Sequence, residues 1–285
     1  AHIICRIVVF KFRDLNSLPY PNLEGALVRS KSADGAFWKN RLGDYYFDPS
    51  SEDVLRYIIA VSKRAIRDGC DELNYDYLRF PSDGALTDIR YPSGSETPEL
   101  KRGVIAVFIQ GLSRGIRLSH STIPISADLF GYAAMGRNPG IGQFPEDFIR
   151  AGYKIYSMLY PSLFSCADFG LLNPNTNPYI TVRRSVEEKL QYLLKRGLGD
   201  GVLRGTFTAW IQGNDSGSYQ CKVEPNPRIL YYSDPAVLRA QIRGIEDALQ
   251  NGVFKKLNLK PSWIVWHSSG LYNPASYLPK GTKER

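Results

Sequence analysis

Two acidic residues stand inside stretches that otherwise read as buried β-strands. In "ELNYDYLRFP", Asn74 and Asp76 fall among aromatic and apolar residues, and Ser126 and Asp128 do the same in "PISADLFG". Side chains of one parity share a face of a strand, so each acid shares its face with the polar residue two positions before it. Burying an unpaired carboxylate is costly. Two such acids on consecutive strands therefore indicate acid–base chemistry, in which one donates a proton and the other carries negative charge.

Further polar and aromatic residues stand near the ends of the later predicted strands. The same parity selects Tyr160 in "KIYSMLYP", Trp210 and Gln212 in "LRGTFTAWIQ", and Trp266 in "SWIVWHSSG". Indole rings offer flat apolar surfaces on which sugar rings stack, and phenols and amides hydrogen-bond sugar hydroxyls. If these faces share one hollow with the two acids, the hollow has the composition of a sugar site.

Each of these residues also has a purely structural interpretation. A strand-end aspartate can cap the next helix or pair with Arg6 or Arg79, and Asp128 can form a turn beside Gly131. Tyr160 and the two tryptophans can pack in the core. Composition alone does not decide between these interpretations.

The elements that must position these residues alternate along the chain. Predicted strands cover 3–12, 72–80, 124–131, 154–161, 203–212 and 262–270, and predicted helices cover 49–69, 97–115, 145–152, 182–197 and 234–252. Strict alternation indicates parallel strands joined by helical crossovers. No glycine-rich phosphate turn follows a strand, which disfavours an open nucleotide-binding sheet. Polar and aromatic residues at the carboxyl ends of the strands favour a (β/α)8 TIM-barrel type.

Six βα units are visible in this pattern, so the first two units of an eight-fold barrel are expected to be missing. We expect one domain over residues 1–285, a partial β/α barrel of catalytic type. The polar stretch 213–235 follows a predicted strand and is expected to be an active-site loop, not a domain boundary.

Composition limits the partners and cofactors. The 285 residues carry a net charge of +8, but the basic residues are mixed with acids along helices, so nucleic acid is not the expected partner. No apolar run is long enough to span a membrane. The cysteines show no metal-ligand spacing, so we expect no metal and no cofactor, and they leave two disulfides open: Cys5, Cys70, Cys166 and Cys221.

Several motifs in order make the sequence resemble a known family. They are "RIVVFK", "FDP", "ELNYDYLRFPSDG", "ISADLFGY", "IGQ" at 141–143, "YSMLYPS" and "VLRAQIRGIEDA…WIVWHSSG", and they run from about Arg6 to Gly270. The chain resembles a bacterial family with a domain of unknown function, assigned to glycoside hydrolases of TIM-barrel type. Family members usually carry two further strand–helix units upstream, and their family implies an extracellular or cell-surface location.

The resemblance implies roles for individual residues. Asp76 would end the fourth barrel strand as nucleophile or stabilising carboxylate, and Asp128 would end the fifth as general acid. Arg6 and Lys11 match family positions on the third strand and would hold Asp76 ionised.

Together these patterns predict a glycoside hydrolase that acts on a polysaccharide or oligosaccharide. The expected catalytic residues are Asp76 and Asp128. The expected substrate-binding residues are Arg6, Lys11, Asn74, Arg79, Tyr160, Trp210, Gln212 and Trp266. An alternative is a catalytically inactive carbohydrate-binding or cell-surface structural protein on the same fold. A third is a basic protein that binds nucleic acid or an anionic wall polymer. The pattern specifies neither a particular sugar nor an oligomeric state.

Overall fold

The computed structural model describes residues 1–17, 21–94, 97–120, 122–137, 140–199, 203 and 207–277. Two compact units divide the chain, Ala1–Ile155 and Tyr156–Arg285. Each unit combines helices with parallel strands, as the alternation predicts. Closure into an eight-stranded barrel, and a single domain over the whole chain, stay predictions.

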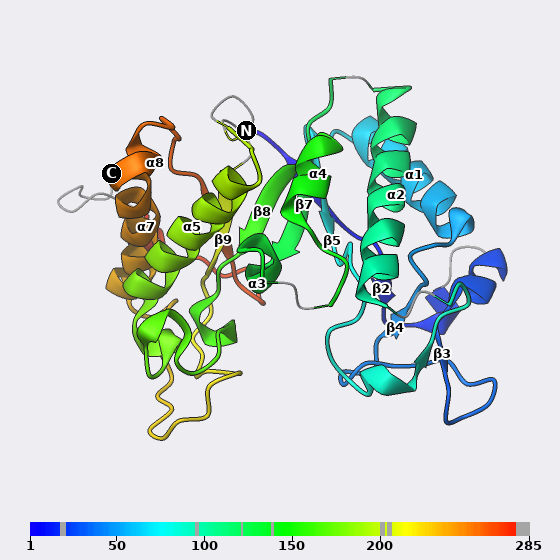
Figure 1. Cartoon of the computed structure of the whole chain (residues 1–285), viewed down its shortest axis with the longest axis horizontal. Coiled ribbons are helices and arrows are strands. Elements are labelled where there is room, and N and C mark those ends of the chain that lie inside the picture. The colour runs from blue at the N-terminus through cyan, green and yellow to red at the C-terminus, as the bar shows by residue number, and fades with distance from the viewer. Residues whose placement is uncertain are drawn as a thin grey trace. The chain divides into compact units, whose positions relative to one another are not determined.

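Parallel strands form the centre of the first unit (Figure 1). Its main strands are β1 (Ile4–Val8), β5 (Glu72–Asp76) and β7 (Ile125–Phe130), and β8 (Lys154–Met158) contains the boundary between the units. The register places Arg6 opposite Asn74, and Asn74 opposite Ser126. This register brings polar side chains of three strands into one row.

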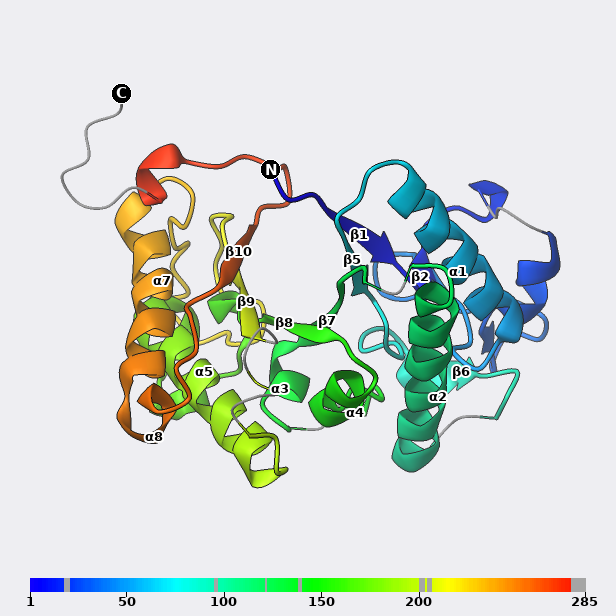
Figure 2. The ribbon, with the colours of Figure 1, turned by 90° about the horizontal axis from the view of Figure 1, so that it is seen from above.

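Helices of the first unit cover one side of these strands (Figure 2). They are α1 (Glu52–Arg67), α2 (Pro98–Arg117), α3 (Gly131–Ala134) and α4 (Pro145–Arg150). The hydroxyls of Ser51 and Thr97 cap the two long helices by accepting a backbone N–H of the first turn. Gly111 lets α1 and α2 approach closely, because a Cβ there would lie 2.9 Å from a methyl group of Leu55.

Short antiparallel pairs occupy the region that the sequence indicates only as a loop. β2 (Lys11–Phe12) pairs with β4 (Tyr45–Tyr46), and β3 (Arg29–Ser30) pairs with β6 (Ile89–Arg90). The predicted strand over 3–12 is therefore two strands, and Lys11 lies on β2, not on the strand of Arg6. Two-residue strands are too short to show the alternation by which a strand is recognised.

The second unit packs two long helices against its strands (Figure 2). β9 (Phe207–Gln212) pairs in parallel with β10 (Trp263–Trp266), and the helices are α5 (Pro178–Lys195), α7 (Pro235–Gln250) and α8 (Gly252–Lys255). Residues 204–206 of the predicted strand 203–212 lie outside the described residues. The phenol of Tyr179 on α5 donates to Asp247 on α7, at 2.7 Å.

The polar stretch 213–235 is ordered by contacts within the second unit. Cys221 forms a disulfide with Cys166, and Ser216 bridges to Ile229. Asp215, which looks solvated in the sequence, accepts hydrogen bonds from backbone N–H groups at the far end of the stretch. The stretch is therefore a loop held in place within the second unit. That it is an active-site loop stays a prediction.

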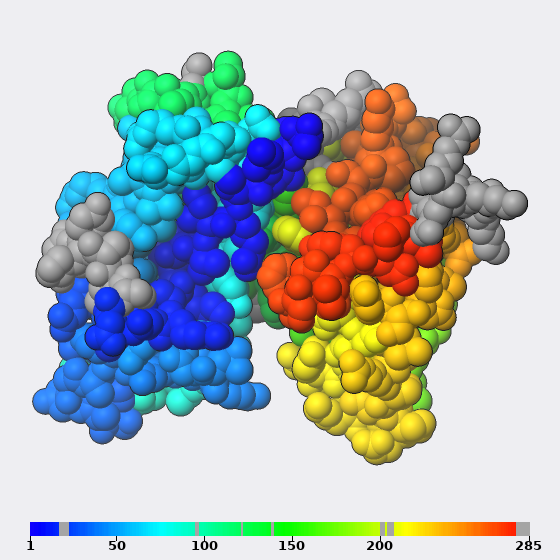
Figure 3. Space-filling model, turned by 180° about the vertical axis from the view of Figure 1, so that it is seen from behind, coloured from blue at the N-terminus to red at the C-terminus, as the bar shows by residue number. Residues whose placement is uncertain are grey.

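A second disulfide joins Cys5 on β1 to Cys70, just before β5. All four cysteines of the chain are therefore paired, which settles what spacing left open. The start of the chain is on the surface, where Ile3 is 53% exposed, and the deep-blue segment is visible on the face shown in Figure 3.

Candidate active site

The two predicted catalytic acids approach the same guanidinium. Arg6 on β1 donates from Nη2 to Asp76 Oδ2, and its Nε lies 3.8 Å from Asp128 Oδ2. Both carboxylates are almost fully buried, with exposures of 5% for Asp76 and 2% for Asp128. The acids therefore lie on the same face of adjacent strands, as the parity argument requires, and one positive charge faces both.

Asn74 connects the two strands beneath the acids. Its Nδ2 donates to Asp128 Oδ1 at 2.9 Å and to Ser126 Oγ at 3.2 Å, while its buried Oδ1 has no hydrogen-bond partner in the described structure. Asn74 is completely buried. Its predicted role was substrate binding, and the contacts that it makes here are to the acid-bearing strand.

The charge of Arg6 is fixed by its surroundings. Burial by itself lowers the pKa of Arg6, but the charges of Asp76 and Asp128, together with the hydrogen bond to Asp76, outweigh it and raise the pKa above its usual value. Arg6 is therefore held in its cationic form between the two acids. A carboxylate that accepts from a guanidinium is well suited to carry negative charge.

Lys11 and Arg79 lie near the acids but bind other groups in the contacts described. Lys11 donates to Asp44 Oδ2 at 3.1 Å, and Arg79 donates to the carbonyl of Phe80 and to Ser82 Oγ. Lys11 was expected to help hold Asp76 ionised. The ion pair of Lys11 is with Asp44, so the described contacts give this expectation no direct support.

Tyr77 lies in this region, although no pattern in the sequence singles it out. It follows Asp76 with φ of +52°, a conformation that bulky residues rarely adopt, and its backbone N–H donates to Asp76 Oδ1 at 2.6 Å. Lys11 Nζ lies 4.0 Å from the centre of the ring, and the Arg79 guanidinium carbon lies 4.9 Å from it. Backbone strain of this kind is concentrated at functional sites, and here it directs an N–H toward a carboxylate.

The remaining predicted binding residues belong to the second unit. The rings of Trp210 and Trp266 meet edge to face, with centroids 6.2 Å apart, and both are partly exposed. Tyr160, also partly exposed, follows β8, where the N–H of Leu159 donates to the Trp210 carbonyl. The unit thus brings these aromatics onto neighbouring strands. That these aromatic residues share a hollow with the two acids stays a prediction.

The side-chain amide of Gln212 is held by hydrogen bonds to protein groups at both its oxygen and its nitrogen. Its Oε1 accepts from the N–H and the hydroxyl of Ser162, and its Nε2 donates to the carbonyl of Asn214. The side chain is 2% exposed. In this structure Gln212 fixes the loop after β8.

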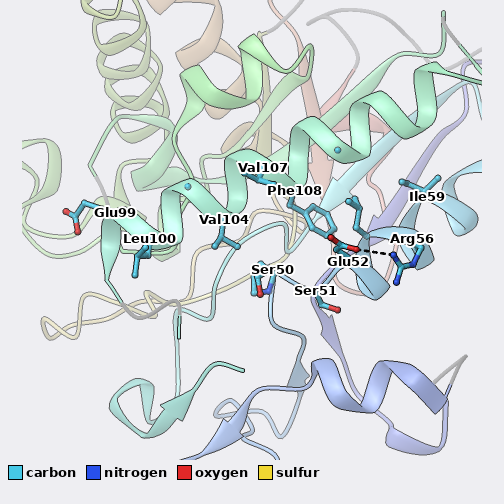
Figure 4. A pocket seen from close by; sticks show the side chains of 14 residues that line it. Ser50, Ser51, Glu52, Arg56, Ile59, Glu99, Leu100, Val104, Val107 and Phe108 are labelled. Carbon is cyan, nitrogen blue, oxygen red and sulfur yellow. Dashed lines mark hydrogen bonds and ion pairs between the residues drawn. The ribbon is translucent and has the colours of Figure 1, made fainter. Parts of the chain in front are cut away.

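An apolar groove lies elsewhere in the first unit, between α1 and α2 (Figure 4). It has a volume of about 550 Å³, and its lining is mainly apolar, with Leu55, Ile59, Val104, Val107 and Phe108. Neither Asp76 nor Asp128 lines it. The groove is therefore separate from the acid pair.

Among the described residues, no cluster of three or more histidine, cysteine or acidic side chains could hold a metal ion. Within the same residues, no helix combines the length and apolarity needed to cross a bilayer.

The sequence profile of one protein family, described as "Putative glycosyl hydrolase domain", matches residues 1–272. The chain belongs to this family. The match includes the acid pair, Arg6 and all the aromatic residues of the second unit discussed above. The family resemblance that the motifs indicate is therefore confirmed over residues 1–272 of this chain.

Solved structures with a likeness to this glycosyl hydrolase domain include a hypothetical protein from Ruminiclostridium thermocellum, at 28% identity over 45% of this chain and 58% of that one, with a TM-score of 0.34. The glycoside hydrolase domain of PelA from Pseudomonas aeruginosa is 11% identical over 98% of this chain and 81% of that one, with a TM-score of 0.44. An alpha-L-fucosidase from Paenibacillus thiaminolyticus is 13% identical over 97% and 36%, with a TM-score of 0.47. Likenesses of this size carry no argument about function. No curated protein matches the chain.

Proposed function

We propose that this domain hydrolyses glycosidic bonds of a polysaccharide or oligosaccharide through Asp76 and Asp128. The observation that carries the proposal is the pair of buried carboxylates on adjacent strands, both facing Arg6. Glycoside hydrolysis requires two carboxyl groups in different protonation states near one bond. Membership of the glycosyl hydrolase family supports this chemistry over other uses of an acid pair.

The hydrogen bonds of the two acids favour different roles. Asp76 accepts from the cationic Arg6 and from the N–H of Tyr77, and we assign to it the role of attacking or stabilising the oxocarbenium-like carbon. Asp128 accepts from a neutral amide, Asn74, and lies farther from the guanidinium. Asp128 is therefore the better candidate for the group that protonates the leaving oxygen.

Residues other than the two acids are also proposed to contact the substrate. Arg6, Lys11 and Arg79 would act near the acids, and the partly exposed Tyr160, Trp210 and Trp266 would bind sugar rings. Asn74 and Gln212 would support the site through their hydrogen bonds to protein groups. The partial exposure of Trp210 and Trp266 supports this use, since the face of an indole ring is a flat apolar surface on which a sugar ring can stack.

A second candidate is carbohydrate binding without turnover. The burial of both acids favours it, because carboxyl groups that are 5% and 2% exposed present little surface to a substrate. In this case the domain would bind glycans and release no reducing ends.

Reducing-end release from a panel of glucans, xylans, galactans and amino-sugar polymers separates the two candidates. For a hydrolase we expect Asp76→Asn and Asp128→Asn each to lose at least about a thousandfold in kcat. Glu72→Gln is the matched control, because Glu72 is a buried acid at the opposite end of β5, paired with Lys154. Full activity in either aspartate variant refutes the assignment. Glycan binding in calorimetry without any product supports the second candidate.

We also propose an extracellular or cell-surface location. Two disulfides that use every cysteine support it, since such bonds persist mainly in oxidising compartments. Fractionation of producing cells, with the chain found in the reduced form inside the cell, would contradict this location.

A further inference from the structure

Residues 141–143, the "IGQ" stretch, contribute to the family resemblance but have no place in the proposed chemistry. In the structure Gln143 is 1% exposed, and its amide binds three backbone groups. Nε2 donates to the carbonyl of Asp128 at 3.0 Å and to that of Leu78 at 3.4 Å, and Oε1 accepts from the N–H of Phe130 at 2.9 Å. One side chain thus joins the end of β7 to the segment that follows β5.

These bonds lie where the strand pairing ends. The register between β5 and β7 runs through Leu73 opposite Ile125 to Tyr75 opposite Ala127. Asp76 and Asp128 each come one residue after that last pair. Beyond the ladder, Gln143 holds the backbone of Asp128, and the carbonyl of Ile141 accepts from the N–H of Phe80 at 3.0 Å.

The loop that carries Gln143 is itself fixed from its other side. Gly142 has φ of +79°, and a Cβ there would lie 2.7 Å from the carbonyl oxygen of Lys101 and 2.7 Å from a side-chain carbon of Ile105. The loop backbone therefore sits directly against α2, at a position that only glycine fits. The side chain of Gln143, which follows Gly142 in this loop, therefore has little freedom to move.

We propose that Gln143 is a positioning residue that sets the place of the Asp128 carboxyl relative to Asp76. It acts through the Asp128 backbone and touches neither carboxylate in the bonds described. The activity readout of this inference rests on the proposed function. Catalysis needs both acids within a fraction of an ångström of the productive geometry, so loosening one of them lowers turnover more than binding.

The test compares Gln143→Met and Gln143→Glu with a matched control. The first variant removes all three bonds at similar size. The second keeps an acceptor for the Phe130 N–H but loses both donors. Tyr153→Phe is the control, because it removes a buried hydrogen bond of the same unit, from Tyr153 to the carbonyl of Ile109. All variants are assayed well below their melting temperatures, on the polysaccharide of the panel that the wild type hydrolyses fastest.

We expect kcat to fall at least about tenfold in both Gln143 variants, with KM within about threefold of the wild type, and both constants to stay within about twofold in Tyr153→Phe. An unchanged kcat in either folded Gln143 variant overturns the proposal. So does an equal loss in the control, since it would mean that any lost bond lowers activity.

A readout without activity separates this inference from the proposed function. The carboxyl carbon resonance of Asp128, assigned with Asp128→Asn, should move in the Gln143 variants and stay in place in Tyr153→Phe. If the wild type hydrolyses no polymer, the proposed function fails and this resonance alone decides the positioning role. An unmoved resonance overturns it.

Discussion

Lys189 gives a prediction that tests the packing of the second unit. It lies on α5 with 1% exposure, and its Nζ donates to Ser157 Oγ on β8 at 2.7 Å. Burial lowers the pKa of Lys189 from 10.5 to about 7. The perturbation is Lys189→Met, which keeps the length of the side chain and removes the titrating group.

The sign follows from proton counts. An unfolded lysine keeps its proton up to about pH 10.5, whereas the folded one loses it near pH 7, so between these values the unfolded state binds more protons. The free energy of unfolding therefore rises with pH across this window and falls as the pH drops toward 7. The slope for one such group is about 1.4 kcal/mol per pH unit, or roughly 2 to 3 kcal/mol between pH 7.5 and 9.5.

Urea unfolding followed by tryptophan fluorescence measures this rise. Three of the four tryptophans, Trp210, Trp263 and Trp266, belong to the second unit, so the signal reports mainly on it. The rise between pH 7.5 and 9.5 should be present in the wild type and in the control Lys195→Met, an exposed lysine of the same helix, and absent in Lys189→Met. If the free energy of unfolding rises equally with pH in the wild type and in Lys189→Met, burial does not lower the pKa of Lys189.

Three further changes have defined outcomes. Cys5→Ser with Cys70→Ser opens a disulfide of sequence separation 65, and thermal or urea unfolding should show a loss of roughly 4 kcal/mol by the chain-entropy model, while a loss under about 1 kcal/mol contradicts it. Gly142→Ala should destabilise by at least about 2 kcal/mol through its positive φ and its contact with the Lys101 carbonyl, and a neutral result would mean that the loop can move away from α2. Trp266→Ala should raise KM about tenfold with a smaller change in kcat if its ring binds substrate, and an unchanged KM assigns the ring to packing.

The order of elements was predictable from the sequence because their patterns are long and local. The helices over Glu52–Arg67 and Pro235–Gln250 have apolar residues at helical spacing and polar caps, and each lies within the range predicted for it. The acids on β5 and β7 were predictable as neighbours for a similar reason, since parity and strand order alone place them on one face. The structure brings both to Arg6.

Contacts between distant segments could not be predicted in the same way. The role of Gln143 depends on a side chain that meets a distant backbone group, and that of Tyr77 depends on one unusual φ. Neither feature produces a periodic pattern in the sequence. The partner of Lys11 was missed because Asp44 lies on a segment that looks like loop. The glycine of "IGQ" was the available signal, since glycine is the residue that most readily adopts the positive φ of a tight loop.

The bond between Cys5 and Cys70 closes a covalent ring that contains α1 and three of the short antiparallel strands, β2, β3 and β4. A protease that cuts once anywhere inside that ring releases no fragment, because both new ends remain attached through sulfur. On a gel the nicked molecule runs as one band until a thiol is added. A single cut in this least regular part of the first unit therefore leaves the chain in one covalent piece.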